Sequence, residues 1–242
     1  MPLFQTSVQK KFIAELNKEK VDLAFAKLIA HFGNPTIQEN IRNAKEEQYQ
    51  EGFLSQLFVD VFGYTLHPQP NFNLITEQKN EKDSKKADGA ILKQMSNGFK
   101  PIAVIELKSL KTTDLQSIEI QAFNYKNNQS GCVYVISSNF QKLRFYIEDA
   151  VNFEEFDLFD LSRERFGLLY FCLHVDSLLK DAPLRCKVLS LEKEEAITKK
   201  LYADYSGFRQ ALYKDIVARN KSKGFKPGVL NNKKSSPKFI YL

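Results

Sequence analysis

The spacing of apolar residues predicts helices in the first and last thirds of the chain. In residues 8–16 and 21–32 the apolar positions recur at about 3.6 residues, and Gly33-Asn34-Pro35 then interrupts the pattern. The same spacing returns near the C-terminus in Phe166–Leu179 and Leu191–Asn220. Both ends of the chain are therefore expected to be helical.

A longer helix is expected over Ile37–Phe62. Gly63 follows it, and a glycine is common just past the C-terminus of a helix. The buried stripe of this helix is predicted to consist of Leu54, Leu57, Phe58 and Val61.

The middle of the chain has the pattern of strands around one helix. The expected strands are Ala87–Leu92, Pro101–Ser109, Cys132–Ser137 and Leu143–Ile147. A helix with Asp114 or Thr113 as N-cap is expected over Leu115–Lys126, and residues 67–70 and 77–86 are expected to be loops or edge segments. This order predicts an α/β sheet domain with a crossover helix.

Composition narrows the class of protein. With 242 residues and 43% hydrophobic residues, the chain can form one domain plus an appended segment, or two small domains. It has neither an apolar run of about 20 residues nor an apolar N-terminal signal, so no membrane partner and a cytoplasmic location are expected. The three cysteines lack CxxC spacing and accompany only three histidines, which argues against structural zinc.

The net charge of +6 is concentrated at the C-terminus. Residues 214–242 contain eight basic residues and one acidic residue, Asp215. Such a segment can bind phosphates with release of counterions, or it can be a solvated tail. The sequence leaves both alternatives open.

The strand Ile102–Lys108 carries the candidate chemistry. Side chains alternate along a strand, so Glu106 and Lys108 project from the same face of an otherwise apolar segment. Buried charges of this kind need each other, a ligand or a metal. A strand end at which both charges meet water is the alternative.

Asp88 in the preceding strand favours a metal or ligand site over a solvated strand end. If the two strands pair as a hairpin, Asp88 lies beside Glu106, and two converging carboxylates suit Mg²⁺. An aspartate at the edge of a turn is the simpler interpretation of Asp88 alone.

Two helices supply further candidates. In the crossover helix, Gln121 shares a face with Ile118, Ala122 and Tyr125, so its amide is expected to point toward the sheet, where it could also be an ordinary core glutamine with satisfied hydrogen bonds. In the long helix, Glu47 and Glu51 lie on the stripe of Leu54 and Phe58, and either could approach the site or remain solvated.

Together these residues resemble the PD-(D/E)xK nuclease superfamily, and more narrowly the N-terminal endonuclease region of type IIG restriction–modification enzymes. The similarity covers roughly residues 45–220. It is carried by EGFLSQLFVDVFGY, ADGAI with VIELKS, IQAFNYKNN with VYVISSN, and LYADYSGFRQALYKDIVARN.

The resemblance implies a fold and a division of the chain. The fold is a restriction-endonuclease-like mixed sheet flanked by helices, with N-terminal helices and a C-terminal helical segment. Its expected parts are N-terminal helices (1–40), a nuclease core (41–160), a helical connector (161–220) and a poorly ordered basic tail (221–242).

The resemblance also implies an activity, the Mg²⁺-dependent hydrolysis of double-stranded DNA. Asp88, Glu106 and the carbonyl of Leu107 would hold the metal, and Lys108 would stabilise charge at the phosphate or orient the attacking water. Gln121 would hold Lys108, the water or a phosphate, and Glu47 or Glu51 would support a metal-bound water. These roles are expectations taken from the family.

The chain has no match to a methyltransferase's cofactor-binding glycine motif or to its Asn-Pro-Pro-Tyr motif. A methyltransferase and specificity domain is therefore expected on missing sequence or on another chain, and a homodimer is compatible with cutting both strands. The alternatives are a catalytically inert DNA-binding or interaction remnant, and the nuclease subunit of a type I-like or repair complex.

Overall fold

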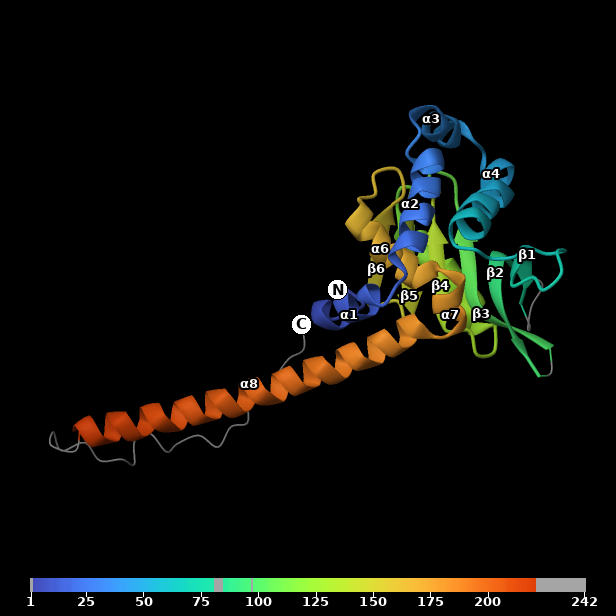
Figure 1. Ribbon diagram of the computed structural model, residues 1–242. Helices are drawn as coiled ribbons and strands as arrows, with labels where there is room; N and C mark the ends of the chain where they lie inside the picture. Colours follow the sequence, from blue (N-terminus) through green and yellow to red (C-terminus); the bar gives the residue numbers. More distant parts are fainter. Residues whose placement is uncertain (1, 81–84, 97, 221–242) are drawn as a thin grey trace. The chain divides into compact units, whose positions relative to one another are not determined.

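The computed structural model describes residues 2–80, 85–96 and 98–220, and Figure 1 shows them as a coloured ribbon. The chain divides into two compact units, Met1–Leu191 and Glu192–Leu242. The predicted basic tail, 221–242, lies outside the described residues. No helix in the described ranges is both long enough and apolar enough to cross a membrane.

The first unit contains a six-stranded sheet in which the strand order is β1-β2-β3-β4-β5-β6. Only β3 and β4 are parallel, and every other neighbouring pair is antiparallel. Helix α5 connects the parallel pair, as the predicted crossover requires. The strands are β1 (Leu74–Lys79), β2 (Lys86–Met95), β3 (Gly98–Leu107), β4 (Tyr134–Ser138), β5 (Lys142–Ile147) and β6 (Phe153–Asp157).

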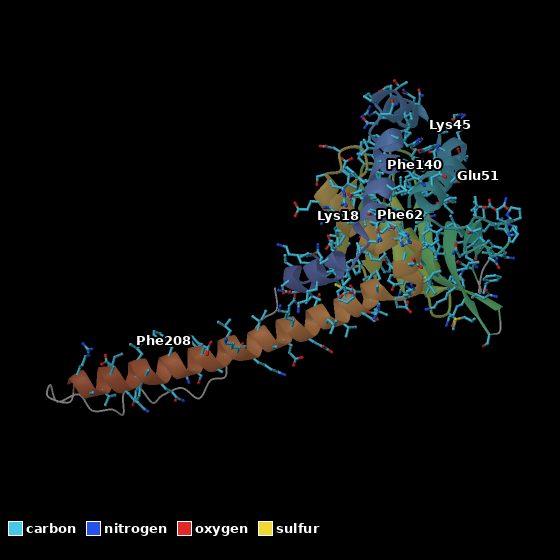
Figure 2. All side chains as sticks on the ribbon, in the orientation of Figure 1. Lys18, Lys45, Glu51, Phe62, Phe140 and Phe208 are labelled. Atoms are coloured by element: carbon cyan, nitrogen blue, oxygen red, sulfur yellow. The ribbon has the colours of Figure 1, made fainter. Side chains whose placement is uncertain are left out.

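Helices cover both faces of this sheet, which confirms the α/β class with a mixed sheet flanked by helices. The described helices are α1 (Thr6–Ala14), α2 (Lys18–Phe32), α3 (Pro35–Asn43), α4 (Glu46–Phe53), the π-helix η1 (Leu54–Val61), α5 (Leu115–Asn127), α6 (Arg163–Leu173), α7 (Val175–Leu179) and α8 (Ala182–Asn220). The large hydrophobic cluster on one face includes Phe62 and Phe140, labelled in Figure 2, and also residues of α1, α2 and α6. The predicted N-terminal segment, 1–40, therefore shares its core with the sheet.

The smaller cluster lies under α5 on the opposite face. There Ala122 and Tyr125 pack against Val104 of β3 and Val135 of β4. Of the two N-cap candidates, Thr113 and Asp114, it is Asp114 that caps this helix, by accepting the Gln116 N–H at 2.9 Å.

The predicted helix over Ile37–Phe62 is wrong as one continuous element. It is interrupted at Ala44 and Lys45, whose backbones are extended, and the side chain of Gln48 accepts the Lys45 N–H at 3.0 Å. The second part then widens into η1, where the Phe62 N–H donates to the Leu57 carbonyl, five residues back. The predicted buried stripe of Leu54, Leu57, Phe58 and Val61 is confirmed.

Other boundaries differ from the sequence prediction in identifiable ways. The segment Phe166–Leu179 forms two helices, because His174 is extended between α6 and α7. The last helix begins at Ala182, nine residues before the predicted start. Strands β1 and β6, at the two edges of the sheet, were not predicted as strands.

Candidate functional site

The C-terminal end of β3 brings the predicted acidic residues together. In the β2–β3 ladder Gly89 pairs with Ile105 and Ala90 pairs with Val104, so the next step of this register sets Asp88 opposite Glu106. Opposite residues of a ladder project from the same face. The hairpin expected from the sequence is confirmed.

Lys108, just past β3, donates hydrogen bonds to three oxygen atoms. Its Nζ lies 2.8 Å from Glu106 Oε1, 2.9 Å from the carbonyl oxygen of Leu107 and 3.1 Å from Glu46 Oε1. Burial lowers the pKa of this ammonium, but the hydrogen bond and charge of Glu106, with the charge of Asp88, outweigh it, and the net pKa is raised. Lys108 therefore stays positively charged.

Asp88 is half-buried and anchors the two strands at their ends. Its Oδ2 accepts the main-chain N–H of Leu107 at 2.7 Å, and the side chain of Gln50 also donates to it. Burial raises the pKa of Asp88 despite these hydrogen bonds and the charge of Lys108. The carboxyl group thus sits in a poorly solvated position with like charges nearby.

Glu106 is the most enclosed member of the cluster, with 1% of its surface exposed. Burial, followed by the negative charge of Asp88, raises the pKa of Glu106 to about 7, although Lys108 acts in the opposite direction. Its second oxygen, Oε2, is buried and has no hydrogen-bond partner among the described residues. A buried carboxylate oxygen without a partner is a position where a cation or a water gains from binding.

The helix glutamate at this site is Glu46, and not Glu47 or Glu51, which the sequence predicts. Glu46 reaches Lys108 from the first turn of α4, whereas Glu47 and Glu51 are exposed, the latter labelled in Figure 2. Extending the η1 stripe backwards from Phe58 at 3.6 residues per turn leads to Glu47 and Glu51. A π-helix holds more residues per turn, so the face that continues the stripe passes through Glu46 and Gln50 instead.

Gln50 was missed for the same reason. The signal that could have identified both residues is their four-residue spacing, which continues to Phe53 and Leu54, both fully buried.

Gln121 is not brought to Lys108. Its Nε2 donates to the hydroxyl of Tyr125 at 3.1 Å, and both side chains line a pocket of about 490 Å³. The predicted inward stripe is otherwise confirmed, since Ile118, Ala122 and Tyr125 are buried. The lining of this pocket is rich in amides and consists of Asn80, Lys85, Ser117, Ile120, Gln121, Asn124, Tyr125 and Asn128.

The residues fit a divalent ion in part. Within the described ranges there is no group of three or more His, Cys, Asp or Glu side chains arranged to hold a metal. Two carboxylates, of Asp88 and Glu106, do converge, and the Leu107 carbonyl points at a cation, the ammonium of Lys108. Hard oxygen ligands that leave room for water are what Mg²⁺ requires, and a metal bound to the Leu107 carbonyl would replace that hydrogen bond.

No family model matches the chain, and no curated protein or solved structure matches it either. A function is therefore inferred from the residues and from their geometry.

Proposed function

We propose that this chain is a Mg²⁺-dependent DNA endonuclease of the PD-(D/E)xK type with a restriction-endonuclease-like fold. In this proposal it acts as the nuclease part of a type IIG-like restriction–modification system. The described residues are proposed to supply only the nuclease, and the methyltransferase and specificity functions of such a system would be supplied by a partner.

The observation that carries the proposal is the cluster at the end of β3. Asp88 and Glu106 come from two neighbouring strands and Lys108 follows β3, and the Glu106 oxygen that Lys108 leaves free is buried with no hydrogen-bond partner among the described residues. A purely structural ion pair would be expected to satisfy both oxygens of so enclosed a carboxylate. The incomplete hydrogen bonding therefore supports a site that receives a ligand.

Asp88, Glu106 and the Leu107 carbonyl would hold Mg²⁺, which when bound polarises the phosphate and lowers the pKa of a bound water. Lys108 supplies a compact positive charge, which can stabilise the negative charge that develops on the phosphate during hydrolysis. Glu46 positions Lys108 through its 3.1 Å contact, and Gln50 fixes the orientation of Asp88.

The pocket beside α5 supports a nucleic acid as the substrate. Lys85 lines it three residues before Asp88, which corresponds to about 10 Å along an extended strand. Amide side chains such as those of Asn124 and Asn128 can donate to phosphates and can hydrogen-bond base edges. A DNA strand whose phosphate lies at Asp88 could therefore continue into this pocket.

The deciding experiment is cleavage of supercoiled plasmid by the full chain in Mg²⁺, in Ca²⁺ and in EDTA. The parent should nick or linearise the plasmid only with Mg²⁺, and Asp88→Ala should not cut it. DNA binding measured in Ca²⁺ shows whether the variant still engages its substrate. Equal cutting by the parent and by Asp88→Ala would rule out this site.

A parent protein that binds DNA but cuts it under none of these conditions would instead support the inert DNA-binding remnant. Cutting that depends on an added helicase partner would support the nuclease subunit of a type I-like or repair complex.

A further inference from the structure

Two buried oxygen atoms on neighbouring strands lack hydrogen-bond partners within the described part of the chain. They are Glu106 Oε2 on β3 and Ser137 Oγ on β4. Glu106 is 1% exposed and Ser137 is fully buried. Both atoms are thus withdrawn from bulk water.

The sheet register sets these two residues side by side. Glu106 pairs with Ser137 in the parallel β3–β4 ladder, two steps after Val104 pairs with Val135. Because Val104 and Val135 both pack in the cluster under α5, alternation along the strands directs Glu106 and Ser137 to that same face. The hydroxyl therefore belongs to the same side of the sheet as the acidic site.

The neighbour of Ser137 on β5 does not supply a hydrogen-bond partner for the Ser137 hydroxyl. Ser137 pairs with Arg144 of β5, but Arg144 is held by other groups. Its Nε donates to Glu155 at 2.7 Å, and its Nη1 lies 3.9 Å from Glu119. The guanidinium is therefore directed toward the carboxylates of β6 and α5.

Packing alone does not explain a serine at this position. The preceding residue on the same face of β4 is Val135, which packs in the apolar cluster under α5. Ser137 is the next residue of β4 on this face, and Glu106 is its neighbour on β3. An unsatisfied hydroxyl on this face costs stability that an apolar side chain of similar size would not cost. A ligand that hydrogen-bonds to both oxygens removes this cost.

We propose that Ser137 is a positioning residue of the acidic site, and that its hydroxyl and Glu106 Oε2 together hold a water molecule of the hydrated Mg²⁺. This inference rests on the proposed function, because that function supplies the ion. A hydroxyl can donate to Glu106 or accept from the water, and Mg²⁺ normally keeps several of its waters in proteins. Ser137 thereby fixes both the carboxylate and the hydration shell of the ion.

The test is the affinity of the full chain for Mn²⁺, followed by electron paramagnetic resonance, in the parent and in Ser137→Ala. Groups outside the direct ligand set commonly change metal affinity 10- to 100-fold, so Ser137→Ala should weaken binding by about tenfold. In EDTA the same variant should unfold at or above the parent temperature, because it removes an unpaired buried oxygen.

Ser138→Ala is the matched control on the same strand. The Ser138 hydroxyl is satisfied, since it donates to the Lys142 carbonyl at 2.8 Å and accepts the Phe140 N–H at 3.0 Å. Its removal should lower the unfolding temperature and leave the Mn²⁺ affinity unchanged. The two serines therefore separate a role in ion binding from a role in folding.

The Mn²⁺ and cleavage results test the role of Ser137 separately from the proposed nuclease activity. If the parent binds Mn²⁺ and cuts DNA but Ser137→Ala binds Mn²⁺ equally well, the role of Ser137 is overturned and the nuclease stands. If Ser137→Ala lowers the unfolding temperature in EDTA and leaves the affinity unchanged, the hydroxyl is structural only. A parent that binds no Mn²⁺ overturns both.

Discussion

At the scale of single residues, the protonation state of Glu106 governs the site. Its carboxyl group is enclosed, it faces the negative charges of Asp88 and Glu46, and Lys108 is its only compensating cation in the described part of the chain. These surroundings favour the neutral acid until the pH approaches the raised pKa of about 7. A divalent ion would reverse that preference by stabilising the carboxylate.

The raised pKa predicts how stability depends on pH in EDTA. Because the folded pKa of Glu106 exceeds its ordinary value of 4.5, the folded state binds more protons, and the free energy of unfolding should fall as pH rises from about 4.5 to 7. Urea unfolding of the parent and of Glu106→Gln between pH 4.5 and 8 measures this. The glutamine variant should lose part of the decline, and equal slopes would contradict the prediction.

The sequence alone predicts the site residues that lie on strands, where side chains alternate. It does not predict the helix glutamate, because that choice requires knowing which face of the helix points to the site. Glu106 and Lys108 are predicted together because side chains alternate along a strand. This two-residue period keeps residues 106 and 108 on the same face. Asp88 follows from the hairpin register. The choice of Glu47 or Glu51 required the phase of a helix to be extrapolated through η1, where the period changes.

At the scale of elements, α4 is predicted to matter through Glu46 and not through its exposed glutamates. Glu46→Gln removes the negative charge that lies beside the Lys108 ammonium. This variant should reduce plasmid cleavage by about tenfold, in the range found for groups that position a catalytic or metal-binding residue. Glu51→Gln, on the exposed side of the same helix, is the matched control and should cut like the parent. Slower cleavage by Glu51→Gln, with parental cleavage by Glu46→Gln, would contradict this prediction and support Glu51 instead.

Helix α5 is predicted to bind the DNA strand through the amides that line its pocket. The double variant Asn124→Ala, Asn128→Ala should weaken DNA binding in Ca²⁺ by about tenfold, which corresponds to two lost hydrogen bonds. The control is Asn127→Ala, an exposed residue of the same helix outside the pocket. Fluorescence anisotropy of a labelled duplex measures the binding, and identical affinities for all three proteins would exclude this surface.

The two strands that the sequence did not predict are both edge strands. β1 has the sequence LITEQK and β6 has FEEFD, so each mixes charged residues into a short segment. Edge strands in natural proteins often carry such charges, which prevent further pairing and weaken the alternating pattern at the same time. The buried central strands β3 and β4 were easy to predict because they are nearly continuous apolar runs.

At the scale of the whole molecule, the core of the first unit extends to the start of α8. Cys186 and Ser190 are buried there, and the Lys187 ammonium donates to the Ile147 carbonyl at 2.7 Å. In the second unit, α8 exposes large apolar side chains that include Leu201, Tyr205 and Phe208, the last labelled in Figure 2. The candidate site, with Asp88, Glu106, Lys108 and Glu46, lies entirely within the first unit.

The proposed hydrolysis requires the positive charge of Lys108 above all. Lys108→Met keeps an unbranched side chain only one atom shorter but removes the charge that lies 2.8 Å from Glu106. Losing this electrostatic contribution should slow Mg²⁺-dependent plasmid cleavage by at least about 100-fold. Cooperative thermal unfolding of the variant should show that the domain remains folded.

The measurement is a time course of supercoiled plasmid cleavage by the parent and by Lys108→Met at the same protein and Mg²⁺ concentrations. Nicked or linear DNA is expected from the parent, and supercoiled DNA from the variant. Equal cleavage rates for two folded proteins would contradict this expectation.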